Sequence, residues 1–286
     1  MFMPHPDEIN ADMLAFWNGA GGQTWVARQE HTDITLAPVT DALLAFAAPK
    51  PGQQVADIGC GCGAPTLALA HAVGPTGRVA GYDISGPMLA EGERRAGIAG
   101  IANVDWRKVD PATEALDQYD LLVSAFGTMF FGDRVAAFAN MRRAAAPGAR
   151  MAIACWRALD ENPWMAVPMA AVARHLPPRP VAVPHAPGMF AFADPGHVTE
   201  VLAAAGWMPP SFERLDLVLD IAAGRGLEEA VIQSTQIGAV NSWLRNQPDK
   251  IVAASIASLR EALGVYADGD SVRLRGAMWL IGSAAG

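Results

Sequence analysis

Three aspartates in the first 110 residues lie at the ends of short segments typical of strands, and their spacing suggests a binding site. Asp57 lies in the run Val55-Ala-Asp-Ile-Gly-Cys-Gly-Cys-Gly63, whose glycines occupy positions 59, 61 and 63. Asp83 ends a second segment of this kind, and Asp110 follows a third, residues 104–109. A carboxylate at the end of a strand attracts hydroxyl groups or positive charge and repels a pyrophosphate, while glycines let a ligand lie against the main chain. The pattern therefore predicts a site for a hydroxyl-bearing or cationic ligand.

The elements that must position these acids alternate between strands and helices. Residues 55–58 predict a strand, residues 65–73 an amphipathic helix, and residues 78–83 a second strand. Strand, helix and strand at this spacing form a parallel βαβ unit. Because ligands bind at the carboxyl ends of strands in open parallel sheets, Asp57 and Asp83 are expected at one shared edge.

Three further strands are expected along the chain. They are residues 104–109, the continuous apolar run 119–126 and residues 149–156. An amphipathic helix over 133–145 should turn Val135, Phe138, Ala139 and Met141 inward and Arg142 and Arg143 outward. A fully apolar run such as 119–126 is typical of a strand that is buried on both faces of a parallel sheet.

Two ligands fit the glycine turn. Gly59, Gly61 and Ala64 satisfy the loose dinucleotide pattern G-x-G-x-x-G/A, so the loop alone leaves NAD or FAD open. However, the Asp57-x-Gly59-x-Gly61-x-Gly63 arrangement resembles the first motif of class I S-adenosylmethionine (SAM) methyltransferases. The recurrence of acids at Asp83 and Asp110 strengthens that resemblance. From Val55 to Trp156 the chain looks like the ubiquinone/menaquinone-biosynthesis type of this family.

The resemblance implies SAM as cofactor, with S-adenosylhomocysteine as its product. By analogy with the family, Asp83 would accept both ribose hydroxyls and Asp110 would accept from the adenine amine. Ile84 and Met88 would flank the adenine, although both also suit an ordinary core. Trp25 would face the sulfonium by cation–π attraction, and core packing accounts for it equally well. The cofactor contacts expected are Trp25, Asp57, Gly59, Cys60, Gly61, Gly63, Asp83, Ile84, Met88, Asp110, Pro111, Ser124 and Phe126.

The segment after the fourth predicted strand indicates a small organic substrate. Enzymes of this family that methylate amino groups of nucleic acids and proteins often carry Asn/Asp-Pro-Pro-Tyr there, whereas this chain has Ser124-Ala-Phe-Gly127 followed by apolar and aromatic residues. The substrate pocket is expected to include Trp25, Met129, Phe130, Trp156, Trp164 and Phe190. Candidate general bases are His31, Asp33, His175, His185 and His197, but nothing in the sequence fixes one near the methyl group. No catalytic residue is assigned.

The general plan of the family predicts the rest of the chain. Residues 196–206 would form a helix, 212–221 the sixth strand and 271–283 a seventh, antiparallel edge strand. The expected fold is an α/β, Rossmann-like, doubly wound sheet of seven mostly parallel strands with helical cap insertions. Its segments would be an N-terminal helical cap over 1–50, the SAM-binding core over 51–156, a cap insertion over 157–195, and the remaining core over 196–286 with a helical insertion at 226–266. Within the first segment, one helix is expected over 26–32 and a second over 39–48, started by Pro38.

Composition narrows the function classes. The 286 residues carry a formal charge of −8, and no basic cluster exceeds Arg142-Arg143, so a nucleic-acid partner is disfavoured. The N-terminus lacks a signal-peptide pattern and no apolar run is long enough for a membrane span, which predicts a soluble, cytoplasmic protein. Three cysteines fit a reducing compartment, and the Cys60-x-Cys62 pair lacks a second ligand pair, so no metal is expected. The oligomeric state is not predicted.

The sequence thus predicts a SAM-dependent methyltransferase that acts on a small apolar or aromatic metabolite at O, N, C or S. Two alternatives are an NAD(P)-dependent oxidoreductase and a non-catalytic SAM-binding protein.

Overall fold

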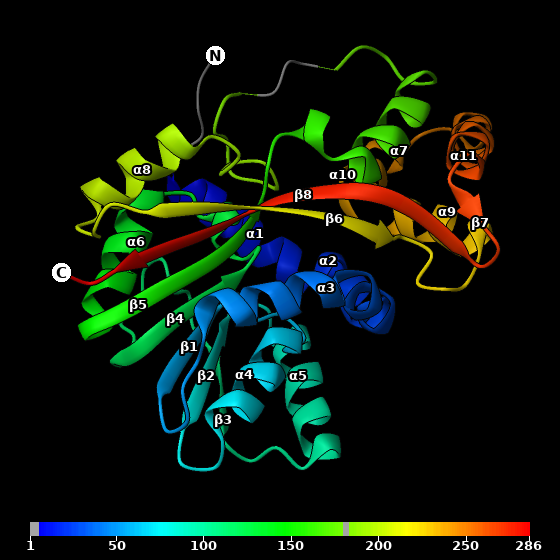
Figure 1. Cartoon of the computed structure of the whole chain (residues 1–286). Helices are drawn as coiled ribbons and strands as arrows, with labels where there is room; N and C mark the ends of the chain where they lie inside the picture. Colours follow the sequence, from blue (N-terminus) through cyan, green and yellow to red (C-terminus); the bar gives the residue numbers. More distant parts are fainter. Residues whose placement is uncertain (1–5, 180–182) are drawn as a thin grey trace.

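A single large sheet organises the chain (Figure 1). The computed structural model describes residues 6–179 and 183–286. The strands lie in the spatial order β3-β2-β1-β4-β5-β8-β6, and a short β7 pairs with β8. Their bounds are β1 Gln54–Ile58, β2 Arg78–Asp83, β3 Val104–Lys108, β4 Tyr119–Ala125, β5 Ala145–Trp156, β6 Ser211–Asp220, β7 Ala267–Asp268 and β8 Ser271–Ala284.

Most of the helices lie around the sheet in three groups, apart from α1 to α3 at the N-terminus (Figure 1). α4 and α5 flank β1 to β3, α6 and α8 lie together near the C-terminus, and α7, α9, α10 and α11 gather at the far ends of β6 and β8. The helix bounds are α1 Pro6–Asn18, α2 Ala20–Ala27, α3 Gln29–Ala47, α4 Ala64–Val73, α5 Gly86–Ala99, α6 Arg134–Arg143, α7 Pro163–Ala173, α8 Pro195–Ala204, α9 Leu227–Gln236, α10 Gly238–Leu244 and α11 Asp249–Gly264, with short 3-10 turns at Thr128–Phe130 and Leu159–Glu161.

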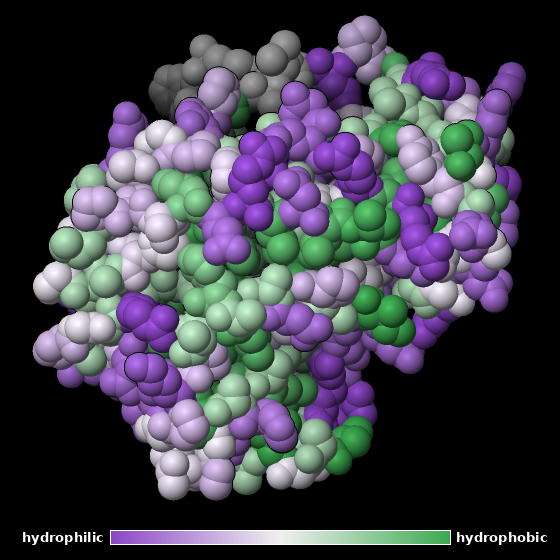
Figure 2. All heavy atoms as spheres, in the orientation of Figure 1, coloured by the Kyte–Doolittle hydropathy of each residue, from purple (hydrophilic) through white to green (hydrophobic). Residues whose placement is uncertain are grey.

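The sheet topology confirms the predicted fold class. β1 to β5 pair in parallel, as βαβ connections require, and β8 runs antiparallel to both of its neighbours. The prediction of an edge strand over 271–283 needs a correction, because β8 lies between β5 and β6 and β6 is the outermost strand. Figure 2 shows hydrophobic residues gathered across the middle of this face, around β6 and β8, and Val218 of β6 is 60% exposed.

The strands at the centre of the sheet are deeply buried. Leu121, Leu122 and Val123 of β4 and Val55 and Ile58 of β1 are all fully buried, as expected for strands covered by helices on both faces. β1 lies between β2 and β4, and the register places Asp57 beside Gly81 on one side and Val123 on the other. β2 and β3 lie on one side of β1, and β4 and β5 lie on the other. The carboxyl end of β1 is therefore at the point where the strand order reverses, which is where open α/β sheets bind their ligands.

The prediction that Pro38 starts a helix is wrong. α3 runs unbroken from Gln29 to Ala47 with Pro38 inside it, and the expected helix over 26–32 is divided between α2 and α3. Pro38 lies on the exposed side, so the carbonyl that loses its partner, that of Ile34, can bind water. On the other side Val39, Leu43 and Ala47 are buried at a spacing of four residues. Packing of this stripe overrides the local preference of proline.

The expected inward face of α6 needs one correction. Phe138 and Met141 are fully buried as predicted, but Val135 is 39% exposed. The helix begins at Arg134, after Asp133, whose carboxylate accepts a hydrogen bond from the backbone N–H of Ala136. Because this cap fixes the first turn at the protein surface, Val135 points away from the core.

The described residues contain neither a bilayer-spanning helix nor a cluster of metal ligands. Over residues 6–179 and 183–286, no helix has the length and apolar character needed to cross a bilayer. The same part of the chain contains no group of three His, Cys, Asp or Glu side chains arranged to hold a metal ion.

Substitution of Pro38 by Ala should stabilise the protein. Pro38 is exposed, so the change removes no core packing, and it restores a backbone N–H inside α3. The free energy of unfolding in urea should rise by roughly 1–3 kcal/mol, since proline is about 3 kcal/mol less favourable than alanine in a helix interior. Ala45→Gly, on the exposed side of the same helix, serves as the control and should lower it by about 1 kcal/mol. A loss of stability in Pro38→Ala would contradict the continuous helix.

Candidate active site

The turn after β1 packs main chain against main chain. Gly59 has φ +70°, and a Cβ built on it would lie 2.7 Å from the Cα of Gly127, which follows β4. Gly63 has φ +83°, and its Cβ would lie 2.4 Å from the ring of Trp106. A side chain is therefore excluded at both positions by conformation and by space. The backbone N–H groups of Gly59 and Cys60 donate to the carbonyl of Tyr82 at 2.8 and 3.0 Å, which fixes the turn on the end of β2.

Asp83 joins the glycine turn to the loop after β2. One carboxylate oxygen accepts from the backbone N–H of Gly61 and the other from that of Ser85, each at 2.8 Å. Burial raises the pKa of Asp83, and the hydrogen bonds from Ser85 and Gly61 oppose that effect. Each oxygen has a further lone pair, so the carboxylate can still accept hydrogen bonds from a ligand.

Asp57 has a different environment from the one that the sequence suggested. Its side chain is completely buried, and one oxygen accepts from the hydroxyl of Thr66 at 2.6 Å while the other has no partner within the described residues. Burial raises the pKa of Asp57 to about 7. Ser124 is equally buried and donates to the carbonyl of Ile58 at 2.7 Å. Asp57 thereby connects β1 to the first turn of α4, and Ser124 connects β4 to the end of β1.

Asp110 folds its own loop. Its carboxylate accepts from the backbone N–H of Ala112 at 2.9 Å and from the hydroxyl of Thr113 at 3.2 Å. This local turn fixes Pro111 beside it, and both residues line the cavity described next.

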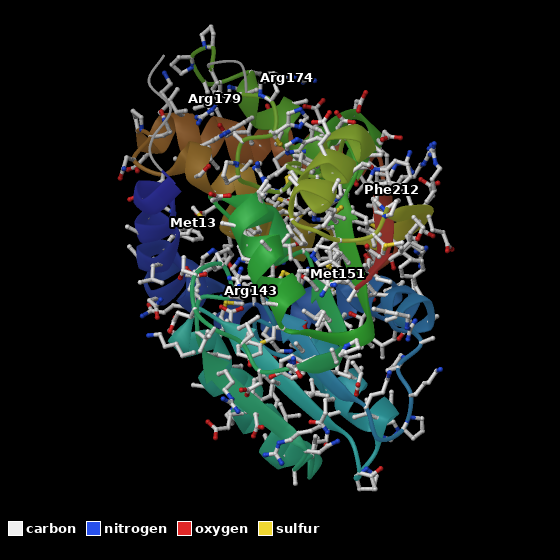
Figure 3. All side chains as sticks on the ribbon, turned by 90° about the vertical axis from the view of Figure 1, so that its left-hand side faces the viewer. Met13, Arg143, Met151, Arg174, Arg179 and Phe212 are labelled. Carbon is white, nitrogen blue, oxygen red and sulfur yellow. The ribbon has the colours of Figure 1, made fainter. Side chains whose placement is uncertain are left out.

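A cavity of about 1250 Å³ opens where the carboxyl ends of the strands meet. Its walls come from α1 to α3, the glycine turn, the loop after β4, α7 and the segment from α9 to α10. Figure 3 labels Met13 of α1, which contributes to this lining. Among the predicted cofactor contacts, the structure brings together Trp25, Gly59, Cys60, Gly61, Gly63, Asp83, Ile84, Met88, Asp110, Pro111 and Phe126. Asp57 and Ser124 do not line the cavity, whereas all six predicted substrate-pocket residues do.

Aromatic side chains form one wall of the cavity. Phe126 and Trp156 stack with ring centroids 4.5 Å apart and an interplanar angle of 10°, and Trp164 leans on Trp156 at 4.6 Å. Phe126 adopts φ +65°, a conformation that is rare for a residue with a side chain and is held here by surrounding contacts. In a second aromatic group, the ring of Trp17 packs edge to face against the rings of Trp25 and Phe130, with centroid distances of 6.0 and 5.8 Å.

The junction of α1 and α2 is fastened to the loop after β2. The side-chain amide of Asn18 donates to the carbonyl of Ile84 at 2.8 Å and accepts from the backbone N–H of Gly86 at 3.2 Å. The hydroxyl of Ser85 donates to the carbonyl of Trp17 at 2.6 Å. Since Ser85 also donates to Asp83 through its backbone, the N-terminal cap and the central carboxylate share one loop.

Only Asp33 among the five candidate bases lines the cavity. His31 is buried, its Nε2 lies 2.9 Å from the carbonyl of Ile221, and burial lowers its pKa. His175 contacts the hydroxyl of Ser258 at 2.7 Å. His185 and His197 stack on each other at 4.0 Å.

Comparison with known proteins agrees with this geometry. Residues 55–148 match the family described as "Methyltransferase domain". The chain therefore contains a methyltransferase domain. Its fold is similar to that of the YcgJ protein of Bacillus subtilis, with a TM-score of 0.56 and 14% identity over 86% of this chain and 97% of that one. It is also similar to Haemonchus contortus phosphoethanolamine N-methyltransferase 2 in complex with S-adenosylhomocysteine, with a TM-score of 0.53 and 16% identity over 99% of this chain and 60% of that one.

Curated relatives of the methyltransferase extend the comparison. Nocamycin O-methyltransferase of Saccharothrix syringae is 29% identical over 81% of this chain and 85% of its own length. The ubiquinone/menaquinone biosynthesis C-methyltransferase of Burkholderia multivorans is 37% identical over 36% of this chain and 43% of its own length. The chain spans about half the length or less of other curated relatives, among them an aklanonic acid methyltransferase, a phytyl-naphthoquinone methyltransferase and the Burkholderia enzyme.

The sequence did not reveal two parts of the cavity wall of the methyltransferase. One is the stripe on α3 formed by Gln29, Thr32, Leu36, Val39 and Thr40, whose helical spacing was a usable signal obscured by Pro38. The other is the α9–α10 segment, in which Gln233, Asn241 and Trp243 line the cavity. No motif marks this segment, because α9 reaches the site through tertiary contacts such as the ion pair between Arg28 and Glu229.

The high pKa of Asp57 should make the methyltransferase less stable as pH rises. The folded state keeps a proton on Asp57 up to about pH 7, whereas the unfolded chain releases it near the ordinary pKa of 3.8. The free energy of unfolding should therefore fall between about pH 4 and 7. Asp57→Asn cannot titrate, so it should lose roughly 2–3 kcal/mol less than the wild type between pH 5 and pH 8 in urea denaturation.

A control for this prediction is Asp105→Asn. The hydrogen bond from Arg78 lowers the pKa of Asp105, so its contribution to stability is already complete at pH 5. That variant should shift the stability curve without changing its slope between pH 5 and 8. Equal losses in the wild type and Asp57→Asn would contradict the assignment of a buried, protonated Asp57.

Proposed function

We propose that this enzyme uses SAM to methylate a small apolar or aromatic metabolite. The observation that carries the proposal is the sign of charge in the cavity. Among the described residues that line it, the charged side chains are Asp33, Asp83, Asp110 and Arg245, and the three from the glycine-turn end are all acids. SAM combines a sulfonium, an ammonium and a carboxylate and is a net cation, whereas NAD(P) carries an anionic pyrophosphate. An acidic wall favours the cation and disfavours the anion.

The start of α4 also disfavours a pyrophosphate. Dinucleotide sites use the free backbone N–H groups at a helix N-terminus to bind phosphate oxygens. Here Pro65 is the second residue of the helix and has no N–H to offer. The first alternative, an NAD(P)-dependent oxidoreductase, is therefore the weaker reading of this glycine turn.

The residues fit the adenosine part of SAM at the acidic end. The two oxygens of Asp83 are already oriented by Gly61 and Ser85, and each can accept from one ribose hydroxyl. Asp110, Pro111, Ile84 and Met88 line the adjoining part of the cavity and would surround the adenine. The space that a Cβ at Gly59 would need is already filled by Gly127, so the turn presents bare backbone.

The aromatic end fits an apolar acceptor. A cavity of about 1250 Å³ exceeds the roughly 300–1,000 Å³ of an ordinary small-molecule site and so has room for a cofactor and a substrate together. Phe126, Trp156 and Trp164 give it a flat apolar wall. The names of the nocamycin and quinone relatives refer to small organic molecules, which supports the same class of acceptor here. The continuous cavity also disfavours the second alternative, a SAM-binding protein without catalysis.

The protein's contribution to the reaction is orientation and exclusion of water. When bound, SAM supplies a methyl group whose bond to sulfur breaks with the electron pair returning to sulfur. The acidic end would fix the adenosine, the aromatic wall would hold the acceptor in line, and the cap of α1 to α3 would exclude water. Holding two reactants about 3–3.5 Å apart accounts for much of a rate enhancement of this kind.

The ribose assignment predicts a specific loss of affinity. Asp83→Ala should weaken S-adenosylhomocysteine binding about thirtyfold, or about 2 kcal/mol, in calorimetry. Asp105→Ala removes an acid of the neighbouring strand that lies outside the cavity, and it should bind like the wild type. Unchanged affinity in Asp83→Ala would remove the ribose assignment. A wild type that binds NADH tightly and SAM not at all would reverse the choice of cofactor.

The aromatic wall predicts a separate effect on the acceptor. With S-adenosylhomocysteine saturating, Trp164→Leu should weaken binding of the probe 2-naphthol by about two- to tenfold, because aromatic contacts contribute about 0.5–1.5 kcal/mol. Affinity for S-adenosylhomocysteine should stay within about twofold, a change too small to count as a lost contact. Trp164→Phe keeps a ring and should recover most of the naphthol affinity. Equal naphthol binding by all three proteins would place the acceptor elsewhere.

A further inference from the structure

Asp33 is an acid of the cavity that the assignments above leave without a ligand. It lies on α3, and its side chain is 26% exposed. One oxygen, Oδ2, accepts from the side-chain amide of Gln29 and from the guanidinium of Arg95, each at 2.5 Å. Within the described part of the chain, no group donates a hydrogen bond to the other oxygen, Oδ1. The carboxylate is thus held firmly on one side and free to accept on the other.

Arg95 fixes where Asp33 lies in the cavity. The second terminal nitrogen of its guanidinium donates to the carbonyl of Cys62 at 2.5 Å. A single planar group therefore connects the carboxylate on α3 to the glycine turn. Asp33 consequently belongs to the glycine-turn end and is not part of the wall formed by Phe126, Trp156 and Trp164.

We propose that Oδ1 of Asp33 accepts a hydrogen bond from the α-ammonium group in the methionine part of SAM. This inference rests on the proposed function. The ammonium needs an acceptor that the adenosine contacts cannot supply, because Asp83 and Asp110 belong to the adenosine end. Asp57 is completely buried and outside the cavity lining, so it cannot reach a ligand. Asp33 is the remaining acid among the described residues of the lining.

The charge environment supports this role. Burial raises the pKa of Asp33, while Arg95 and Gln29 oppose that effect, and Glu91 adds a further negative charge nearby. A hydrogen bond from an ammonium ligand would replace the hydrogen bonds from water that the carboxylate lost on burial. The fixed orientation given by Gln29 and Arg95 also reduces the entropy that is lost when the ligand binds. A role as general base would instead need a carboxylate beside the aromatic wall, where the acceptor is expected.

The test compares two ligands that differ at the amino-acid end. S-Adenosylhomocysteine has the ammonium, and 5′-methylthioadenosine has the same adenosine and sulfur without the amino-acid group. In calorimetry at pH 7.5, Asp33→Asn should weaken binding of S-adenosylhomocysteine about tenfold or more, as expected for loss of a charge-assisted hydrogen bond. Its affinity for 5′-methylthioadenosine should stay within about twofold. Asp83→Ala, in contrast, should weaken both ligands.

Glu91→Gln is the matched control. Glu91 is an acid close to Arg95 that pairs with Arg94 and does not line the cavity. The variant removes one negative charge from the same neighbourhood and should bind both ligands like the wild type. If Glu91→Gln loses as much affinity for S-adenosylhomocysteine as Asp33→Asn does, the loss reflects only the negative charge of the region. That result would overturn the inference.

The remaining outcomes separate the inference from the proposed function. Unchanged affinity for S-adenosylhomocysteine in Asp33→Asn overturns the ammonium assignment alone, and so does an equal loss for both ligands. A wild type that binds neither ligand contradicts the proposed function as well. If Asp33→Asn does not fold, binding of the desamino analogue of S-adenosylhomocysteine to the wild type tests the inference instead. That analogue should bind about tenfold more weakly than its parent, and equal binding would overturn the inference.

Discussion

The two hydrogen bonds that the carboxylate of Asp83 accepts are the interaction on which the site depends. They come from Gly61, in the turn after β1, and from Ser85, in the loop after β2, each at 2.8 Å. Two loops of adjacent parallel strands are thereby fixed around one half-buried carboxylate. The same loop carries the N-terminal cap, since Asn18 contacts Ile84 and Gly86. A single side chain at a strand end thus connects the sheet, the glycine turn and the N-terminal cap.

The features that the sequence predicted well are those decided locally. Strand ends, glycine turns and the βαβ succession follow from residue type over a few positions, which is why β2 begins and ends where it was expected. The predicted cavity residues came together for the same reason, because parallel strands carry their carboxyl ends to one edge whatever the helices do. Asp57 is instructive in this respect. Its place in the strand was correctly predicted, but no local pattern indicates that Thr66, nine residues later, donates to its carboxylate beneath the turn.

The features that the sequence did not predict depend on tertiary contacts. Proline usually begins or ends a helix. However, α3 continues through Pro38, because burial of Val39, Leu43 and Ala47 outweighs the loss of one hydrogen bond. The contribution of α9 and α10 to the cavity comes from contacts between residues about 200 positions apart, such as Arg28 with Gln233. Periodicity contains no information on such pairs. The placement of Asp33 likewise depends on Arg95 and Cys62, which belong to separate elements.

The attachment of the N-terminal cap through Asn18 and Ser85 affects which step limits the rate of turnover. α1 and α2 line the cavity, and the loop to which they are attached also orients Asp83. Detachment of these helices would therefore disturb Asp83 at the same time. Under the proposed function, release of the product cofactor would be coupled to that opening, and we expect this step to limit turnover more than the chemical step does.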